Sequence, residues 1–280
     1  MQEPESYIIS VNGIRLHYLH YLNPGKPVLL LLHGLTANCW AFEGLVRNGL
    51  CEHYELIIPD MRGRGLSTHP AFGYNFKDHT NDLLGLIKHV KATNITLVGH
   101  SYGGLLSSYL ANQHPGIFTK VIFLDAAPVM NKRTPEMLQA SLRRLDKIFP
   151  SKEAYLKEIK KAPYMLFWDD DMQDYYDADI ATNPNKTVKP KPNLAQIMQI
   201  AISVSKEPIG TYFGKLRQPC LLICGSGLYN LGEAILPVIL AEKAVAMLNN
   251  GSLKISEGNH HTMLYGKYAV EVVNWIIEFV

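Results

Sequence analysis

A short segment around a serine places the strongest constraint on how this chain can fold. Residues 97–104 read Leu-Val-Gly-His-Ser-Tyr-Gly-Gly, an apolar stretch that runs into Gly-x-Ser-x-Gly. A serine between two such glycines lies on a sharp turn between a buried strand and a helix, because glycine has no Cβ to clash where the two elements meet. The turn lifts the Ser101 hydroxyl above the end of a sheet and points backbone N–H groups toward whatever it attacks. The motif therefore predicts a strand, a helix and a nucleophile at one sheet edge.

Short apolar runs of strand type recur on both sides of this motif. Asn12-Gly13 predicts a hairpin between residues 7–11 and 15–21. Further strand-like runs cover residues 28–32, 56–58, 95–98, 121–124, 221–224 and 253–255. Helical periodicity occupies several of the intervals, including residues 76–91 and 105–113. Continuous apolar strands that alternate with amphipathic helices indicate an α/β fold with a mostly parallel, doubly wound sheet.

The alternation of strands and helices stops after Pro128 and resumes at Leu221. The intervening sequence has helical stretches at 135–149 and 152–161, an aromatic and acidic segment at 164–176, and a loop at 183–193. We predict a core of residues 1–130 and 217–280, with a largely helical cap of residues 131–216 over the carboxyl edge of the sheet. Asp169-Asp170-Asp171 is interpreted as a solvated loop, since three consecutive carboxylates do not converge on one metal ion.

Composition and charge restrict the classes of partner. Lys and Arg number 27 against 25 Asp and Glu, so no global field favours nucleic acid or an anionic membrane. The longest apolar runs are too short to span a bilayer, and the acidic start of the chain is unlike a secretory signal. The four cysteines lack zinc-ligand spacing and are predicted to be buried free thiols. We expect a cytoplasmic protein that acts on a small molecule without metal or cofactor.

Two further motifs follow predicted strands. Residues 29–35 read Leu-Leu-Leu-Leu-His-Gly-Leu, and a glycine-rich turn covers residues 59–67. With Gly-x-Ser-x-Gly, these motifs resemble the α/β-hydrolase superfamily from about Val11 to the C-terminus. The resemblance implies that Ser101 is the nucleophile and that the N–H groups of Leu35 and Tyr102 form an oxyanion hole. A tetrahedral oxyanion needs two such preorganised donors.

The resemblance also implies a histidine base in a late loop, where residues 256–263 read Ser-Glu-Gly-Asn-His-His-Thr-Met. The stretch Asn-His before Thr favours His260, whereas the more widespread Gly-x-Gly-His pattern would favour His261. Only one of two adjacent histidines can point at Ser101.

The acid of the triad is missing from the place where most members of the superfamily carry it. The segment after the strand at 221–224 holds no carboxylate before Glu233. A histidine base needs a carboxylate to fix its tautomer and to stabilise the imidazolium. We predict that Asp125, at the end of the strand at 121–124, fills this role, as it does in some branches of the superfamily. Glu233 and an unassisted Ser–His dyad are the alternatives.

Residues that select the substrate are expected in the cap. Arg143 and Arg144 are adjacent on a predicted helix and lie about 100° apart, so at most one of them faces a pocket. Arg143 is the candidate for binding a substrate carboxylate, and a solvated basic face is the simpler alternative. Trp168 is the candidate for lining an apolar pocket, and packing of the lid onto the core is its alternative.

The expected function is that of a serine hydrolase which attacks an ester-like or activated carbonyl carbon and forms an acyl-enzyme. Hydrolytic cleavage of a C–C bond, acyl transfer to another acceptor, and a ligand receptor with an intact triad but little turnover are alternatives. Haloalkane dehalogenase and epoxide hydrolase activities are disfavoured, because those members of the superfamily carry Asp at the position of Ser101.

Overall fold

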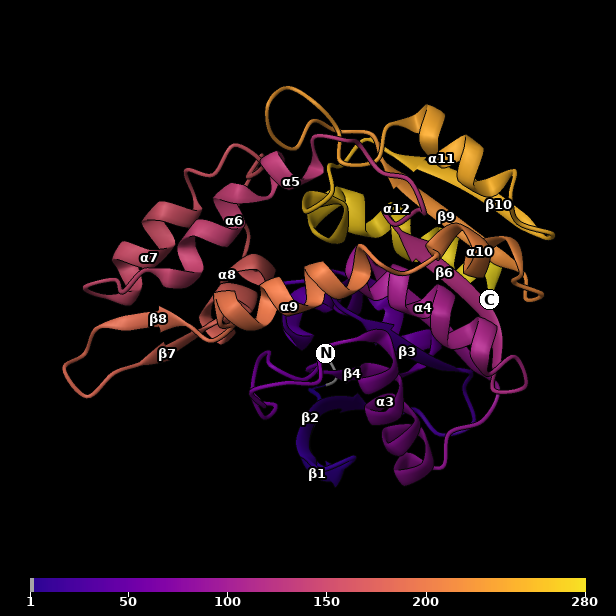
Figure 1. The fold of residues 1–280 in the computed structure, drawn as a ribbon, viewed down its shortest axis with the longest axis horizontal. Coiled ribbons are helices and arrows are strands. Elements are labelled where there is room, and N and C mark those ends of the chain that lie inside the picture. Colours follow the sequence, from indigo (N-terminus) through magenta and orange to yellow (C-terminus); the bar gives the residue numbers. More distant parts are fainter. Residues whose placement is uncertain (1–2) are drawn as a thin grey trace.

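Eight strands form one sheet at the centre of the computed structural model, which describes residues 3–280 (Figure 1). Their order is β1-β2-β4-β3-β5-β6-β9-β10. The strands are β1 (Glu5–Val11), β2 (Ile14–Tyr21), β3 (Val28–Leu32), β4 (Glu55–Pro59), β5 (Ile95–His100), β6 (Phe118–Leu124), β9 (Cys220–Gly225) and β10 (Gly251–Ser256). Strand β2 pairs antiparallel with β1 and β4, and the other neighbours pair in parallel. The predicted α/β fold with a mostly parallel sheet is confirmed.

Helices cover both faces of the sheet. One face carries α3 (Phe76–Val90), α4 (Tyr102–Gln113), α10 (Ile209–Gly214) and α11 (Val238–Val245). The other carries α12 (Gly266–Phe279) and the short helical turns between Cys39 and His53. Successive strand residues point to opposite faces. In β3, Leu30 and Leu32 therefore enter one apolar cluster, whereas Leu29 and Leu31 enter the other.

A mainly helical segment lies beside the sheet, at the left of Figure 1. It contains α5 (Thr134–Met137), α6 (Gln139–Arg143), the 3-10 helix η3 (Arg144–Asp146), α7 (Lys152–Ile159), α8 (Asp170–Ala178), the hairpin strands β7 (Ile180–Thr182) and β8 (Val188–Pro190), and α9 (Leu194–Val204). Helix α10 then returns the chain to the core, where Phe213 packs on Phe123 with ring centroids 4.5 Å apart.

The helix predicted at 135–149 is broken into α5, α6 and η3. Its apolar side chains pack into different clusters: Met137 joins Tyr229 and Ile235, whereas Leu145 joins the main core. A straight helix would not reach both clusters, and the chain bends between them. The loop predicted at 183–193 likewise contains β8.

Asp169-Asp170-Asp171 begins helix α8 and is not the predicted solvated loop. The Asp169 side chain accepts the Met172 N–H at 2.9 Å and caps the helix. Asp170 and Asp171 occupy the first turn, where the helix dipole stabilises carboxylates. An acidic run followed by helical residues is itself a signal for the start of a helix, so the start of α8 could have been predicted from the sequence.

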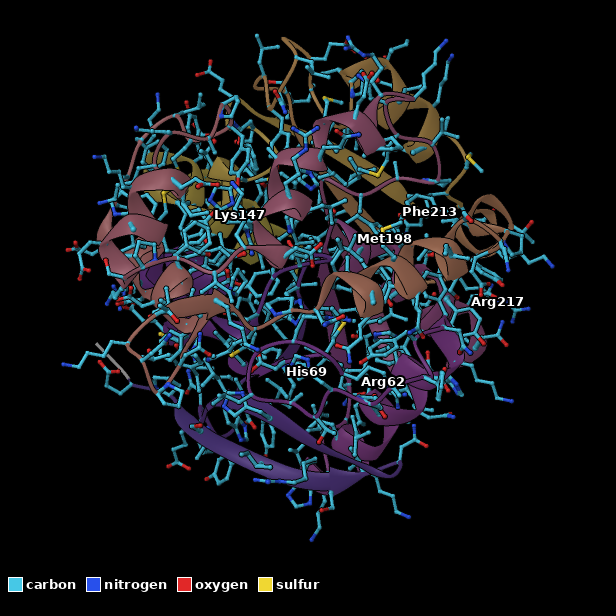
Figure 2. The ribbon with its side chains drawn as sticks, turned by 60° about the vertical axis from the view of Figure 1, so that its left-hand side comes forward. Arg62, His69, Lys147, Met198, Phe213 and Arg217 are labelled. Carbon is cyan, nitrogen blue, oxygen red and sulfur yellow. The ribbon has the colours of Figure 1, made fainter. Side chains whose placement is uncertain are left out.

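The cap is attached to the core on two sides. On one side, Arg47 binds Asp171 at 2.8 Å and also pairs with Asp174 on α8. On the other, α9 crosses the loop that contains His69, and His69 Nδ1 lies 3.1 Å from the Gln196 side-chain oxygen (Figure 2). Gln199 donates to the Ala71 carbonyl at 3.1 Å. These polar contacts join the helical segment to the core.

The four cysteines are buried and unpaired, as predicted. Within residues 3–280, no helix combines the length and apolar character needed to cross a bilayer.

Glycines at the turn between β5 and α4 let the helix approach the sheet closely. A Cβ on Gly103 would lie 1.9 Å from the Leu32 carbonyl oxygen, and one on Gly99 would lie 2.5 Å from the Gly103 carbonyl oxygen. Both clashes are with backbone atoms, which cannot move without displacing a strand or the helix. The glycines predicted from Gly-x-Ser-x-Gly are therefore required by packing.

We expect Gly103→Ala to lower the free energy of unfolding by about 3 kcal/mol, because the new methyl group overpacks a rigid junction. Gly116→Ala is the matched control, since a Cβ at Gly116 meets no atom within 4 Å. Urea denaturation of both variants tests the expectation. Equal stabilities for the two variants would contradict the packing argument.

Candidate active site

Ser101 occupies the turn between β5 and α4 in a conformation that is rare for residues other than glycine. Its φ is 53° and its ψ is −118°. The Ser101 N–H donates to the Leu124 carbonyl at 3.0 Å, which ties the turn to β6. The hydroxyl caps no helix N–H, although Ser101 immediately precedes α4. The strained backbone thus leaves the hydroxyl available for a different partner.

That partner is His260. Its Nε2 lies 3.0 Å from Ser101 Oγ, and its Nδ1 lies 2.6 Å from Asp125 Oδ2. With the proton on Nδ1 donated to the carboxylate, Nε2 is free to accept the proton of Ser101. The structure thus brings together Ser101, Asp125 and His260, in an arrangement that can activate a serine hydroxyl.

Asp125 lies at the end of β6 with a left-handed φ of 49° and is completely buried. Its Oδ1 accepts the Gly225 N–H at 2.8 Å, and its own N–H donates to the Ile223 carbonyl at 2.8 Å. The last residue of β9 thus donates a hydrogen bond to the carboxylate that follows β6. A buried carboxylate requires such partners to remain charged.

Glu233, the alternative acid, lies elsewhere. Its carboxylate accepts from Asn131 Nδ2 at 2.7 Å and from Arg133 Nη1 at 2.6 Å. It does not line the cavity beside Ser101. This pairing connects the start of the cap to the loop after β9.

His261 forms part of the cavity wall and makes no hydrogen bond with Ser101. Its Nε2 lies 3.4 Å from the Tyr176 hydroxyl. Burial, with help from His260 and Arg144, lowers the pKa of His261 to about 3. The side chain is therefore neutral near pH 7.

His100 contacts His260 close to the turn at Ser101. Its Nε2–H donates to the His260 carbonyl at 2.8 Å, and the two rings lie 4.7 Å apart. Burial holds the pKa of His100 well below its usual range. This contact fixes the backbone of the late loop relative to the turn at Ser101.

Of the two residues predicted to form an oxyanion hole, Leu35 lines the cavity and Tyr102 does not. Tyr102 is the first residue of α4, and such residues have no intrahelical acceptor. Leu35 follows Gly34 at the end of β3 and lines the cavity. His33 fixes this turn, because its Nδ1–H donates to the Gly34 carbonyl at 2.8 Å and its Nε2 accepts the Met61 N–H at 3.0 Å.

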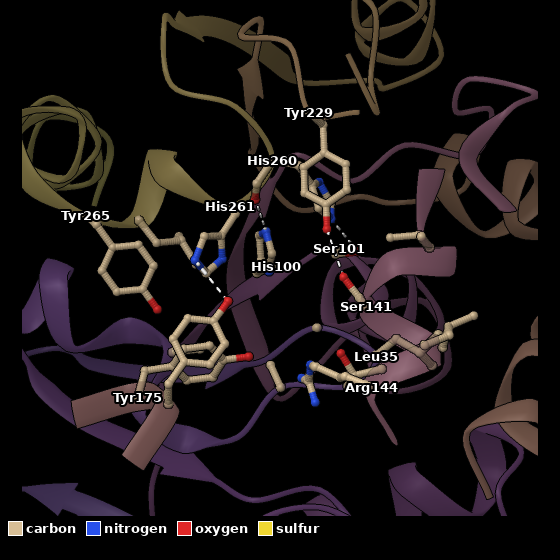
Figure 3. A pocket seen from close by; sticks show the side chains of 18 residues that line it. Leu35, His100, Ser101, Ser141, Arg144, Tyr175, Tyr229, His260, His261 and Tyr265 are labelled. Carbon is tan, nitrogen blue, oxygen red and sulfur yellow. Dashed lines mark hydrogen bonds between the residues drawn. The ribbon is translucent and has the colours of Figure 1, made fainter. Parts of the chain in front are cut away.

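The cavity above Ser101 has a volume of about 80 Å³. Figure 3 shows it enclosed by side chains from the core and the cap. The lining residues are Gly34, Leu35, Thr36, Ala37, Ala41, His100, Ser101, Leu138, Ser141, Leu142, Arg144, Tyr175, Tyr176, Tyr229, His260, His261, Leu264 and Tyr265. The cavity is partly open to solvent.

The structure does not place Arg143 in this cavity. Arg143 is exposed and donates to Gln139 at 3.1 Å, whereas the next residue, Arg144, is buried and lines the cavity. The rotation of about 100° between adjacent helical residues separates the two side chains. Trp168 also lies outside the lining, because it stacks on Tyr176 with ring centroids 5.5 Å apart.

Ser141, Tyr229 and Tyr265 are lining residues that the sequence analysis did not identify. Tyr229 follows β9 in the segment where an acid was sought, and no local motif marks it. Tyr265 follows the short turn after His261, so its closeness to the late loop was the available signal.

A buried group of possible metal ligands, His17, Cys39 and Asp60, lies outside the cavity. Asp60 accepts the Cys39 N–H at 2.8 Å and pairs with His17 Nδ1 at 2.7 Å. The other nitrogen of His17 lies 2.9 Å from Ser6 Oγ. These side chains serve one another as hydrogen-bond partners and stabilise the start of the glycine-rich turn.

Comparison with known proteins gives a family match over residues 27–175, to the model described as the alpha/beta hydrolase fold. The 2-(acetamidomethylene)succinate hydrolase of Mesorhizobium japonicum is 33% identical over 133 residues, which cover 46% of this chain and 48% of that protein. A soluble epoxide hydrolase of Corynebacterium sp. is 30% identical over 122 residues, covering 44% of this chain and 42% of that protein. The chain spans about half the length of the curated relatives that it matches.

Among solved structures, that of E-2-(acetamidomethylene)succinate hydrolase superposes with a TM-score of 0.84. The superposition covers 99% of both chains at 21% sequence identity. This likeness shows a shared fold.

The buried neutral histidines predict a loss of stability in mild acid. Burial lowers the pKa of His33 to about 4 and of His261 to about 3, and it holds those of His79 and His100 well below normal. The unfolded chain binds these protons near pH 6.5, whereas the folded chain does not. The free energy of unfolding therefore falls as the pH decreases from about 6.5 toward 4, by about 1.4 kcal/mol per pH unit for each such histidine.

Urea denaturation between pH 7.5 and 4.5 measures this slope. We expect His261→Gln to remove the contribution of one histidine and His53→Gln, at an exposed position, to leave the slope unchanged. An unchanged slope in His261→Gln would show that His261 is not kept neutral by burial.

Proposed function

Because the chain belongs to the alpha/beta hydrolase fold family, we propose that it is a serine hydrolase which cleaves an ester-like or activated carbonyl bond of a small molecule through an acyl-enzyme. One observation carries the proposal: Ser101 Oγ lies 3.0 Å from His260 Nε2, and the other nitrogen of the same ring lies 2.6 Å from the buried Asp125. We assign Ser101 as the nucleophile, His260 as the base and Asp125 as the acid of this hydrogen-bonded chain.

In the first half of the proposed reaction, Ser101 Oγ attacks the carbonyl carbon while its proton passes to His260 Nε2. Asp125 stabilises the resulting imidazolium, because its carboxylate accepts the Nδ1–H. The bond between the carbonyl carbon and the leaving group then breaks. The leaving group takes the proton from Nε2, and the acyl group remains on Ser101.

The negative charge that develops on the carbonyl oxygen needs donors that are already in place. We assign this role to the N–H groups of Leu35 and Tyr102. Neither group donates to a protein acceptor among residues 3–280. Each oxyanion donor of this kind is worth roughly 10²–10³-fold in rate in enzymes of similar chemistry.

In the second half, water takes the place of the serine hydroxyl. His260 accepts a proton from water, the hydroxide attacks the acyl carbon, and the proton returns to Ser101 as the acid is released. Water as the final acceptor distinguishes hydrolysis from acyl transfer, and product analysis with an added alcohol separates the two.

The names of the relatives indicate which bonds are reasonable candidates. One relative is named as a hydrolase of 2-(acetamidomethylene)succinate, whose name contains an acetamide group. Another is named as an epoxide hydrolase, but the members of the superfamily with that activity carry Asp where this chain has Ser101. A serine nucleophile therefore favours acyl chemistry. The cytoplasmic location expected from the sequence stays a prediction.

A serine-reactive fluorophosphonate should label Ser101 in the folded protein, because the activated hydroxyl attacks phosphorus as it attacks carbon. Intact mass and peptide mapping measure the adduct. Ser101→Ala should abolish labelling, whereas Ser141→Ala, which removes the other serine lining the cavity, should retain it. Labelling at a site other than Ser101 would refute the nucleophile assignment.

The acid assignment predicts that Asp125→Asn lowers kcat for a small ester by about 10³–10⁴-fold, because the amide favours the wrong tautomer of His260. Glu233→Gln is the matched control and should change kcat by no more than a few fold. Steady-state hydrolysis of a panel of small esters gives both values. Near-normal activity in Asp125→Asn would exclude Asp125 as the acid of the triad.

A further inference from the structure

Arg144 presents a buried guanidinium to the same cavity as Ser101. The residue is 4% exposed and belongs to the cap helix η3. Figure 3 shows its nitrogen atoms among the lining side chains, between Tyr175 and Leu35. A cationic side chain thus reaches the cavity from the cap, opposite the nucleophile on the core.

The guanidinium forms an ion pair with a buried carboxylate, but its hydrogen-bonding capacity is not filled. Its Nη1 lies 3.0 Å from Asp179 Oδ2, but this contact lacks the alignment of a hydrogen bond. Neither Nε nor Nη1 of Arg144 donates a hydrogen bond to any atom of residues 3–280. A buried cation in this state costs several kcal/mol unless its remaining donors find an acceptor. The missing acceptor is expected on a ligand.

Asp179 orients Arg144 and does not close the cavity. The Asp179 side chain is fully buried, lies outside the lining and also accepts a hydrogen bond from the Tyr155 hydroxyl. Held from behind in this way, the guanidinium keeps one orientation before any ligand arrives. Preorganisation of this kind reduces the entropy lost on binding.

The rest of the cavity also favours an anion. None of its lining residues is acidic, and Arg144 is the one lining residue with a permanent charge. The buried hydroxyl of Tyr265 also has no hydrogen-bond partner among the described residues and lines the same space. The lining itself therefore holds no carboxylate, and the negative charge nearest Arg144 is that of Asp179, behind the lining.

We propose that Arg144 forms a subsite for a carboxylate, and that the substrates are small molecules which carry a carboxylate a few bonds from the carbonyl that Ser101 attacks. The planar fork of guanidinium N–H donors matches the two oxygens of a carboxylate. Because Arg144 and Ser101 line one cavity, a short chain is expected to separate the two groups of the substrate. The inference rests on the proposed function, since it specifies which acyl compounds that site accepts.

A pair of esters that differ only at the anion tests the subsite. Monoethyl succinate carries a terminal carboxylate, and ethyl succinamate carries a carboxamide of nearly the same shape. Release of ethanol gives kcat/KM for each. In the wild-type protein we expect the carboxylate ester to be preferred by roughly 10–100-fold, the range for hydrogen bonds to charged groups. Equal values of kcat/KM for the two esters would overturn the proposal.

Three variants assign the preference to Arg144. In Arg144→Gln the ratio of the two kcat/KM values should fall to near one, and in Arg144→Lys it should be intermediate. Arg143→Gln, at the exposed neighbouring position, should keep the wild-type ratio. A full preference for the carboxylate in Arg144→Gln would show that another group binds the anion.

Ligand binding without turnover gives an independent measure. Succinate should raise the Tm of the wild-type protein and of Arg143→Gln, and it should not raise that of Arg144→Gln. Stabilisation of the wild-type protein by inorganic phosphate but not by succinate would overturn the assignment to a carboxylate.

Fluorophosphonate labelling of Ser101 in each variant distinguishes a failure of the carboxylate subsite from a failure of the proposed hydrolase function. If Ser101 is labelled but the two esters react equally, the subsite is wrong and the proposed function stands. If Ser101 is not labelled in the wild-type protein, the proposed function itself fails. A variant of Arg144 that still labels has an intact nucleophile and a folded cavity, so a changed ratio then reports on the subsite.

Discussion

The contact between Asp125 and His260 is the interaction on which the site depends, because it joins parts of the chain that the cap separates. Asp125 ends β6 before the cap begins, and His260 lies in the loop after β10. The carboxylate is completely buried, so it needs hydrogen-bond donors from more than one element. It obtains them from the His260 ring and the Gly225 N–H, which brings the ends of β6 and β9 and the late loop to one point. The elbow at Ser101 is tied to the same point through the Leu124 carbonyl.

The core of the fold was predictable because its signals are local. Strand runs such as 28–32 and 121–124 are continuous and apolar, and the glycines at 99 and 103 correspond to a backbone approach that only glycine allows. The absence of a carboxylate after β9 also directed attention to Asp125, which the structure places 2.6 Å from His260; its role as the acid stays a prediction. The structure adds that β9, which carries no carboxylate itself, contacts the one on Asp125: the Gly225 N–H donates a hydrogen bond to it.

The cap was less predictable because its structure depends on contacts between distant residues. Periodicity indicated one helix at 135–149, but Met137 and Leu145 pack into different clusters and the helix breaks. The rotation between adjacent helical residues lets only one of the two neighbouring arginines reach the cavity, and composition favours neither. Arg144 is selected because Asp179, 35 positions later, is buried behind it. No local pattern contains this pairing.

The buried carboxylates of Asp125 and Asp179 do not line the cavity, so a negatively charged substrate in the cavity would not contact them. Asp125 lies behind His260, and Asp179 lies behind Arg144, so the groups that face the cavity are a hydroxyl, an imidazole and a guanidinium. This order matters most in the transition state, when a substrate with a carboxylate acquires a second negative charge on the carbonyl oxygen. At a separation of about 6 Å and an effective dielectric constant of about 20, the two charges repel by ~3 kcal/mol. In the proposed reaction, a guanidinium at one end and the N–H groups of Leu35 and Tyr102 at the other would offset that repulsion without bringing either buried carboxylate into contact with the substrate.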